Sequence, residues 1–230
     1  MRIVTFNFLG GGSARRAAHW EHLRALRPDL VLTQESPAQA PPHQTALWTE
    51  ARRGWGTGLY ARRLRLEPIP VRGFRGWVTG GELSGTRTRV FSVHCPAGER
   101  GYVRTMHTLI DRLRPLARDA RLILGGDFNV AAGVRGAQDL VRFSPAERAL
   151  LGRLHDELGL VPAWQAAHPG VPLAQTLRWA GNRSTPYHCD GLFVPREWLP
   201  RLVSCEVLAG PQWEALSDHN PVVANLRGNK

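Results

Sequence analysis

The sequence predicts a mixed α/β sandwich that forms a single domain over residues 1–230. Three observations support this prediction: a strand–helix–strand opening, a middle region of closely spaced β-rich runs, and two later segments with the apolar periodicity of amphipathic helices. Strands that alternate with helices favour parallel pairing, whereas closely spaced strands favour antiparallel pairing. The sheets are therefore expected to be mixed.

The opening region sets up the first strand ends. Residues Arg2–Phe8 and Leu30–Thr33 are rich in β-branched and apolar side chains, which is typical of strands. Between them a helix is predicted over Ser13–Arg27, with a serine at its start and a proline directly after it. Asn7 and Glu35 then lie near the C-terminal ends of two neighbouring strands.

The remaining elements follow from local pattern in the same way. The Pro-rich segment Ala38–Thr49 is expected to be irregular. Two helices are predicted, over Val103–Leu116 and over Pro145–Leu158, the second beginning after Ser144 and ending at Gly159. The further strands expected are Gly54–Tyr60, Leu64–Pro70, Trp77–Leu83, Thr88–His94, Asp190–Val194 and Pro221–Leu226.

The segment Arg121–Val130 combines a short apolar run with two glycines and a polar end. We expect a buried strand that closes at the glycines in a tight exposed turn. Asp127 and Asn129 would then project to one side of the strand while Phe128 anchors the other. On its own, this stretch favours an ordinary turn, because Asp and Asn are common turn residues. The other strand ends decide between the two interpretations.

Composition limits the partners and the compartment. The net charge is +11, which would attract a polyanion such as nucleic acid or an anionic membrane surface. The basic residues are almost all arginine, with Lys230 as the single lysine, and they are scattered along the chain, so the charge permits nucleic-acid binding without proving it. Three cysteines make no disulfide framework, and no apolar run is long enough to span a membrane. We expect a cytoplasmic monomer.

Polar residues stand at several strand ends. They are Asn7, Gln34, Glu35, His94, Asp127, Asn129, Asp190, Asp218 and His219. Hard oxygen ligands without a thiolate cluster suit Mg²⁺ or Mn²⁺. A metal ion, a carboxylate that orients water and a histidine together are what phosphoester hydrolysis requires.

Six short motifs at these strand ends resemble the endonuclease/exonuclease/phosphatase superfamily, which has the deoxyribonuclease-I-like fold. In the family's order they are Thr5–Asn7, Gln34–Ser36, Ser92–His94, Gly125–Asn129, Asp190–Val194 and Ser217–Val222, the fourth and sixth being the more specific. The resemblance implies a four-layer αββα sandwich of two mixed β-sheets flanked by helices. It also implies a metal-dependent hydrolase acting on phosphoesters.

The resemblance assigns roles position by position. It implies a metal site at Glu35 and Asn7, with Asp218 supporting that ion or a second one. It makes Asp127 the residue that orients or deprotonates the attacking water and Asn129 a ligand of a phosphoryl oxygen. The catalytic histidines would be His219, whose tautomer Asp190 fixes, and His94, a phosphate donor or general acid as in deoxyribonucleases and sphingomyelinases. The motif around His94 therefore leans away from the abasic-site endonuclease branch, which has a tyrosine there.

Departures from the family pattern are informative. Deoxyribonucleases carry a glutamate that partners the first histidine, but the corresponding strand here, Trp55–Gly58, has no acid, so the partner of His94 is left open. His188 stands where the family usually has a basic residue, and Arg178 is predicted to contact phosphate. Trp55 and Trp77, with Trp213, are candidates for the substrate rim, although core packing is the usual role of tryptophan.

Other polar and thiol groups are assigned to structure. The histidines outside the motifs, His19 among them, are expected at the surface, and Arg52–Arg53 and Arg62–Arg63 are expected in solvated loops. Strand alternation is expected to point Cys95 and Cys189 away from the site and into the core.

The sequence therefore predicts a Mg²⁺-dependent nuclease acting on DNA or RNA. Within the same chemistry, the alternative is a phosphatase or phosphodiesterase for a small or lipid phosphoester, such as a sphingomyelinase-like or inositol-phosphate activity. A third interpretation, from another class, is a catalytically inactive nucleic-acid-binding module.

Overall fold

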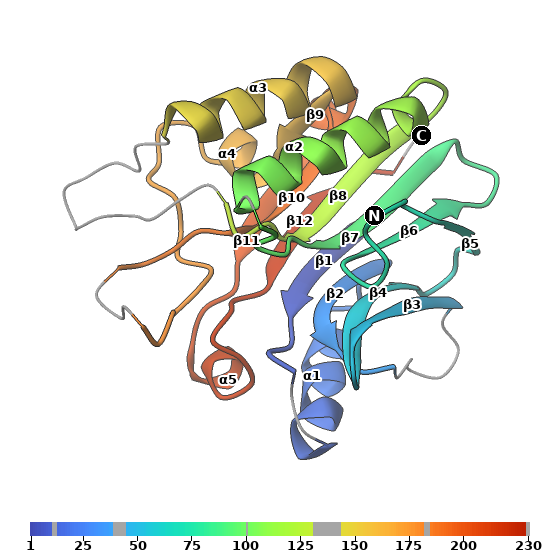
Figure 1. Ribbon diagram of the computed structural model, residues 1–230. Coiled ribbons are helices and arrows are strands. Elements are labelled where there is room, and N and C mark those ends of the chain that lie inside the picture. The colour runs from blue at the N-terminus through green and yellow to red at the C-terminus, as the bar shows by residue number, and fades with distance from the viewer. Residues whose placement is uncertain (11–12, 39–44, 100, 131–143, 182–184, 229–230) are drawn as a thin grey trace.

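The protein is a four-layer sandwich in which two six-stranded sheets face each other and helices cover both outer faces (Figure 1). The computed structural model describes residues 1–10, 13–38, 45–99, 101–130, 144–181 and 185–228. This architecture confirms the predicted αββα arrangement of mixed sheets.

The first sheet contains the two ends of the described chain. Its strand order is β11-β12-β1-β2-β4-β3, with parallel pairing between β1 and β2 and antiparallel pairing elsewhere. The strands are β1 (Arg2–Asn7), β2 (Leu30–Ser36), β3 (Thr45–Arg52), β4 (Trp55–Ala61), β11 (Leu202–Val207) and β12 (Val222–Leu226). Helix α1 (Ser13–Ala25) connects β1 to β2, as the sequence predicts.

The second sheet repeats this plan with the order β5-β6-β7-β8-β10-β9, and β7 and β8 are its parallel pair. The strands are β5 (Leu66–Ile69), β6 (Val78–Leu83), β7 (Thr88–His94), β8 (Arg121–Asp127), β9 (Leu160–Pro162) and β10 (Asp190–Pro195). Helix α2 (Tyr102–Leu113) and a short 3₁₀ turn, η1 (Arg114–Ala117), connect β7 to β8. Parallel strands need such a crossover, so each sheet contains one βαβ unit.

Strand alternation divides the core into three apolar clusters, which correspond to the three layer boundaries. In β1, Ile3 packs between the sheets whereas Val4 and Phe6 pack against α1. In β8, Ile123 likewise faces the other sheet, and its neighbours Leu122 and Leu124 face α2 and α3 (Pro145–Leu158). Side chains that point alternately to the two faces of a buried strand explain why these strands are apolar throughout.

Most element boundaries agree with the sequence patterns. Helix α3 begins at a complete capping box between Ser144 and Glu147 and ends at Gly159, whose φ of 66° is left-handed. The Pro-rich region is a correction, because β3 occupies Thr45–Arg52 and pairs with β4; residues 39–44 of that region lie outside the described residues.

The short elements were not predicted. They are β9, α4 (Ala163–Ala167), η2 (Arg196–Arg201), β11 and α5 (Pro211–Glu214). Among the described helices, none has the length and apolar character needed to cross a membrane.

Candidate active site

Three candidate site residues lie side by side at the edge of the second sheet. In the register of β7, β8 and β10, His94 is opposite Asp127 and Asp127 is opposite Asp190. Each of these residues ends or begins its strand, and all three are buried. Sheet pairing therefore fixes one histidine and two carboxylates in a row before any side-chain contact is made.

The two glycines before Asp127 serve close packing and do not form the turn. Strand β8 continues through both of them, which corrects the expected turn at this point. A Cβ atom on Gly126 would lie 1.8 Å from the carbonyl oxygen of Val93, and one on Gly125 would lie 2.6 Å from Cδ2 of Leu192. The chain turns at Asn129, two residues after Asp127, where φ is 52°. Phe128 is buried against Phe193, as expected.

The first sheet delivers Asn7 and Glu35 to the same place. The side-chain amide of Asn7 donates to Oε1 of Glu35 at 3.2 Å and to Oδ2 of Asp127 at 3.1 Å, so it joins the two sheets. Its own oxygen accepts the backbone N–H of Leu9 at 2.9 Å. In this arrangement Asn7 holds the two carboxylates together. Its predicted role as a direct metal ligand remains a prediction.

Glu35 occupies a strained backbone conformation. Its φ of 47° is left-handed, and the pairing of β2 with β4 shifts register between Thr33 and Ser36. A non-glycine residue in this region costs free energy, and such strain is concentrated at functional sites. The bulge turns the Glu35 side chain away from the sheet pairing and toward Asn7 and His94.

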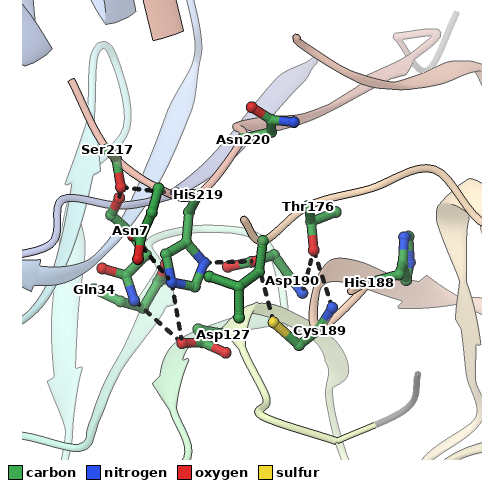
Figure 2. Close-up of polar contacts among 12 residues, drawn as sticks. Asn7, Gln34, Asp127, Thr176, His188, Cys189, Asp190, Ser217, His219 and Asn220 are labelled. Carbon is green, nitrogen blue, oxygen red and sulfur yellow. Dashed lines mark hydrogen bonds and ion pairs between the residues drawn. The ribbon is translucent and has the colours of Figure 1, made fainter. Parts of the chain in front are cut away.

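His219 and Asp190 form a buried hydrogen-bonded pair (Figure 2). The Nδ1 atom of His219 lies 2.8 Å from Oδ2 of Asp190. Burial lowers the pKa of His219, but the negative charges of Asp190 and then Asp127 outweigh it and raise that pKa to about 10. The geometry is the one expected for a carboxylate that fixes the orientation and proton position of a histidine.

Asp127 lies between the two histidines. Its Oδ2 atom is 3.7 Å from Nε2 of His94 and 3.9 Å from Nε2 of His219. Burial, and after it the charge of Asp190, raise the pKa of Asp127 to about 7 against the opposing effect of His219. A carboxylate with a pKa near neutrality is suited to accept a proton from water.

On its side away from the site, His94 has no acidic partner in the part of the chain that the structure describes. Its Nε2 atom lies 3.7 Å from Oε1 of Glu35 and faces the site. Its Nδ1 atom is buried and has no hydrogen-bond partner among the residues that the structure describes. Burial lowers the pKa of His94 to about 4, with the charge of His219 as the second cause. The imidazole is therefore neutral near pH 7.

The chemistry of the donor set fits a divalent cation. Carboxylates of Glu35, Asp127 and Asp218 gather in a chain whose overall charge is strongly positive. The buried Oδ1 atom of Asp218 has no hydrogen-bond partner among the described residues, and Glu35 remains partly exposed. Oxygen ligands of this kind suit Mg²⁺ or Mn²⁺.

A second group of metal-ligating residues lies beside the first. Among the described residues, Cys189, Asp190 and His219 bring ligand atoms within 4.8 Å of one another. Burial raises the pKa of the Cys189 thiol well above its usual value, so this sulfur stays protonated and is a poor metal ligand. We therefore interpret these three residues as the hydrogen-bonded pair of His219 and Asp190 with a neighbouring thiol, and not as a metal site.

Arg178 contacts the chain segment that carries His219. Its guanidinium donates to Oδ1 of Asn220, to the carbonyl oxygen of Ser217 at 2.8 Å and, at 3.5 Å, to that of His219. These contacts hold the segment Ser217–Asn220, which carries His219, in place. Phosphate contact by Arg178 remains a prediction, and the observed partners favour a supporting role.

Two residues of the site had no role assigned from sequence. The hydroxyl of Ser217 donates to the carbonyl oxygen of Asn7 at 2.8 Å and accepts the backbone N–H of His219 at 3.1 Å (Figure 2). The hydroxyl of Thr176 accepts the backbone N–H groups of Cys189 and Asp190 at 2.9 and 3.0 Å. Ser217 lies inside the sixth motif and Thr176 lies outside all six, and a hydroxyl that bonds backbone atoms has no distinctive spacing in the sequence.

Three expectations about the surroundings need correction. The Sγ atom of Cys189 lies 3.6 Å from Oδ2 of Asp190, because the chain enters β10 at this point and regular alternation has not begun. His19 is fully buried and stacks on Phe8 at 4.3 Å. Trp213 is also buried, packed edge-on against Phe6 in the α1 layer, so it is a core residue.

Comparisons with known proteins agree with the fold of this chain. Residues 4–219 match the model of the Endonuclease/Exonuclease/phosphatase family. Among solved structures, the 3' phosphatase NExo from Neisseria, bound to a product DNA hairpin, superposes with a TM-score of 0.76 at 21% identity, covering 99% of this chain and 100% of that one. An AP endonuclease from Archaeoglobus fulgidus gives 0.71 at 18% identity, covering 98% of this chain and 99% of that one. No protein of curated function matches the sequence.

Proposed function

The chain belongs to the endonuclease/exonuclease/phosphatase family of metal-dependent phosphoester hydrolases, and from this premise we propose that it is a Mg²⁺-dependent nuclease that cleaves phosphodiester bonds in DNA or RNA. One observation carries the proposal: Asp127 stands between His94 and His219 with gaps of 3.7 and 3.9 Å. These distances exceed hydrogen-bonding distance, so the two Nε2 atoms and the carboxylate do not bond one another directly and can instead bond an oxygen atom of water or phosphate that lies beside them.

Each side chain of the site has a separate role in the reaction. Asp127, with its pKa near neutrality, accepts the proton of the attacking water. As the new bond from water to phosphorus forms, the P–O bond on the opposite side breaks in line. His219, held by Asp190, carries positive charge near the phosphoryl oxygens and stabilises the charge that develops there.

Asn129 and His94 complete the donor set. The backbone N–H of Asn129 donates to Oδ1 of Asp127 at 3.0 Å, which ties the amide to the base. One side-chain N–H of Asn129 donates to the carbonyl oxygen of Cys95, and its second N–H is available for a phosphoryl oxygen. His94 is neutral and offers one N–H from the opposite side. Glu35 and Asp218 would hold the metal ion, which supplies charge neutralisation at the phosphate when bound.

The surroundings of Asn129 support a nucleic-acid substrate over a small phosphoester. A cavity of about 280 Å³ opens beside Asn129 and is lined by Leu177, Cys189 and three aromatic residues. Two of the aromatic residues, Tyr102 and Trp179, are exposed, and Trp179 packs edge-on against Tyr187. Exposed aromatic rings stack on bases and sugars with little sequence preference. The excess of positive charge favours the same class of partner.

The experiment is a substrate panel with Mg²⁺, Mn²⁺ or EDTA. It contains supercoiled plasmid, single-stranded DNA, RNA, a hairpin oligonucleotide with a 3' phosphate, a generic diester, sphingomyelin and an inositol phosphate. We expect metal-dependent cleavage of one of the nucleic acids at a rate at least about 10²-fold above that of the generic diester. Turnover only of the lipid or inositol compound would establish the small-substrate alternative. No turnover together with salt-sensitive DNA binding would favour the inactive binding module.

A 3' phosphatase activity is the second candidate. One structurally similar protein is described as a 3' phosphatase bound to its product DNA hairpin. A phosphomonoester at a 3' end needs the same base, donors and metal, since it differs from a phosphodiester only in lacking the second esterified oxygen on phosphorus. Release of inorganic phosphate from the hairpin, without cleavage of internal bonds, would favour it.

A further inference from the structure

His94 projects from the end of β7 into the site, yet no polar group among the described residues hydrogen-bonds its ring. Its Nε2 atom faces Glu35 and Asp127, each at 3.7 Å, which is too long for a direct hydrogen bond. Its buried Nδ1 atom has no hydrogen-bond partner in the described parts of the chain. A histidine ring without a hydrogen-bonded partner must be held by packing if it is to present Nε2 reproducibly.

Two indole rings supply that packing. The ring centroid of Trp55 lies 5.6 Å from that of His94, and the centroid of Trp77 lies 5.4 Å from it. The two indoles contact each other edge-on at 5.6 Å, so the three rings form one cluster. The backbone N–H of His94 also donates to the carbonyl oxygen of Trp77 at 2.8 Å. The cluster therefore restrains both the ring and the backbone of His94.

The two tryptophans are carried by segments of different sheets, and hydrogen-bonding contacts join these two segments. Trp55 begins β4 of the first sheet, and Trp77 directly precedes β6 of the second. Thr57, which is fully buried, donates from its hydroxyl to the carbonyl oxygen of Gly76 at 3.0 Å. A second contact, 2.8 Å between the hydroxyl oxygens of Thr57 and Thr79, joins the same strands. The backbone segments that carry the two indoles are thus joined by bonds that do not involve His94.

Arg52 covers the outer side of the cluster. Its guanidinium carbon lies 6.0 Å from the ring centroid of Trp55 and 5.6 Å from that of Trp77. Cations over indole faces are attracted to the ring and stabilise its position. The sequence Arg52 to Trp55 is a tight turn between β3 and β4, closed by a bond from the backbone N–H of Gly54 to Oε1 of Glu50 at 3.0 Å.

We propose that Trp55 and Trp77 are positioning residues that fix the imidazole of His94 by aromatic packing, in a site where no carboxylate of the described residues hydrogen-bonds that ring. This inference rests on the proposed function, in which His94 donates an N–H to the phosphoryl group. With Nδ1 unbonded and two carboxylates near Nε2, the neutral ring carries its proton on Nε2. Misplacing such a donor by about 1 Å costs on the order of 10²-fold in rate.

The test is a double-mutant cycle. Trp55→Leu and Trp77→Leu are each made in the wild type and in His94→Ala, and kcat and KM are measured on the best substrate of the panel. Each single variant should lose about tenfold or more in kcat with KM nearly unchanged, and neither should cause further loss in the His94→Ala background. Trp55→Phe and Trp77→Phe should recover most of the rate. Equal losses in both backgrounds would overturn the proposal, since the indoles would then act on the substrate or the fold directly.

A matched control and a second readout keep the result decisive. Trp179→Leu changes an exposed aromatic residue next to Asn129, and its effect should be the same in both backgrounds. Nitrogen NMR of the His94 ring should show one sharp set of signals, protonated at Nε2, in the wild type. The signals should broaden or split in Trp77→Leu while the melting temperature shows that the protein is folded. Unchanged signals would overturn the proposal even if no substrate is turned over, so this outcome is independent of the proposed function.

Discussion

His219 Nδ1 and Asp190 Oδ2 are separated by 2.8 Å inside a buried pair, although the two residues adjoin strands of different sheets. Asp190 begins β10 of the second sheet, and His219 lies just before β12 of the first. The bond therefore sets the histidine and at the same time joins the two halves of the sandwich. Its energetic consequences should be visible in stability as well as in catalysis.

The first prediction concerns the pH dependence of stability. Because the pKa of His219 is raised above its unfolded value to about 10, its stabilising contribution is complete below about pH 6.5 and is lost as the pH rises toward 10. Asp190→Asn removes the main charge that raises this pKa, so the loss of stability between pH 6.5 and 9 should be smaller in the variant. Urea unfolding in EDTA at several pH values measures this, and parallel curves for the two proteins would contradict it.

Asp127→Asn should trade activity for stability. The folded state raises the pKa of Asp127 from 3.8 to about 7, so keeping this carboxylate charged and buried destabilises the fold above neutral pH. We expect kcat to fall by at least about 10²-fold. In EDTA at pH 8, the free energy of unfolding should rise by more than about 1 kcal/mol, and the gain should vanish near pH 4. A variant that is less stable than the wild type at pH 8 would show that the charge is not the dominant cost.

Ser217→Ala should weaken both the fold and the reaction. The hydroxyl bonds the carbonyl oxygen of Asn7 and the backbone N–H of His219, and its loss leaves buried groups unpaired. We expect destabilisation of about 1–3 kcal/mol together with a lower kcat. Ser204→Ala is the matched control, since Ser204 bonds Asn225 in the same sheet, distant from the catalytic residues. If Ser204→Ala lowers kcat as much, the effect is one of general stability.

Glu35→Gln should remove the response to metal. Addition of Mg²⁺ to the wild type should raise the melting temperature, because an ion that binds only the folded state stabilises it. The neutral amide cannot replace the carboxylate, so this shift should largely disappear in the variant. Glu67→Gln, on β5, should keep it. A full metal shift in Glu35→Gln would place the ion elsewhere.

Arg178→Lys separates support of the catalytic segment from phosphate binding. A lysine keeps the charge but cannot reproduce the three contacts to Ser217, His219 and Asn220. If Arg178 supports the segment, kcat should fall about tenfold or more, and the salt dependence of DNA binding should not change. A direct phosphate contact would instead survive in the lysine variant, and only Arg178→Ala would then reduce the salt slope.

The layered fold could be predicted because its strands and long helices carry clear periodicity, as β8 and α3 illustrate. The residues on each strand end could be listed for the same reason. The sequence did not predict which other residues hold the catalytic side chains in place. The hydroxyls of Ser217 and Thr176 act through backbone atoms, and such bonds depend on how segments distant in sequence approach each other.

The predictions are wrong where a preference read from the local sequence competes with tertiary packing. The two glycines before Asp127 are typical of a turn. In the structure they lie within β8, at positions where a side chain would collide with Val93 and Leu192. The Pro-rich segment Ala38–Thr49 is predicted to be irregular, but pairing with β4 makes its second part a strand. His19 looked like a surface residue because a single polar position on a helix gives no sign of the Phe8 ring against it.

The pairing of β1 with β12 has a consequence for the order of events during biosynthesis. The first strand of the described chain cannot complete its sheet until Val222–Leu226 is available, and His219 lies only a few residues before that strand. Contacts between such distant segments form late, because a long loop must close before they are rewarded. A chain synthesised only as far as β11 would thus lack one histidine of its site. The site can form only after the segment from His219 to Leu226 has been synthesised and has paired with β1.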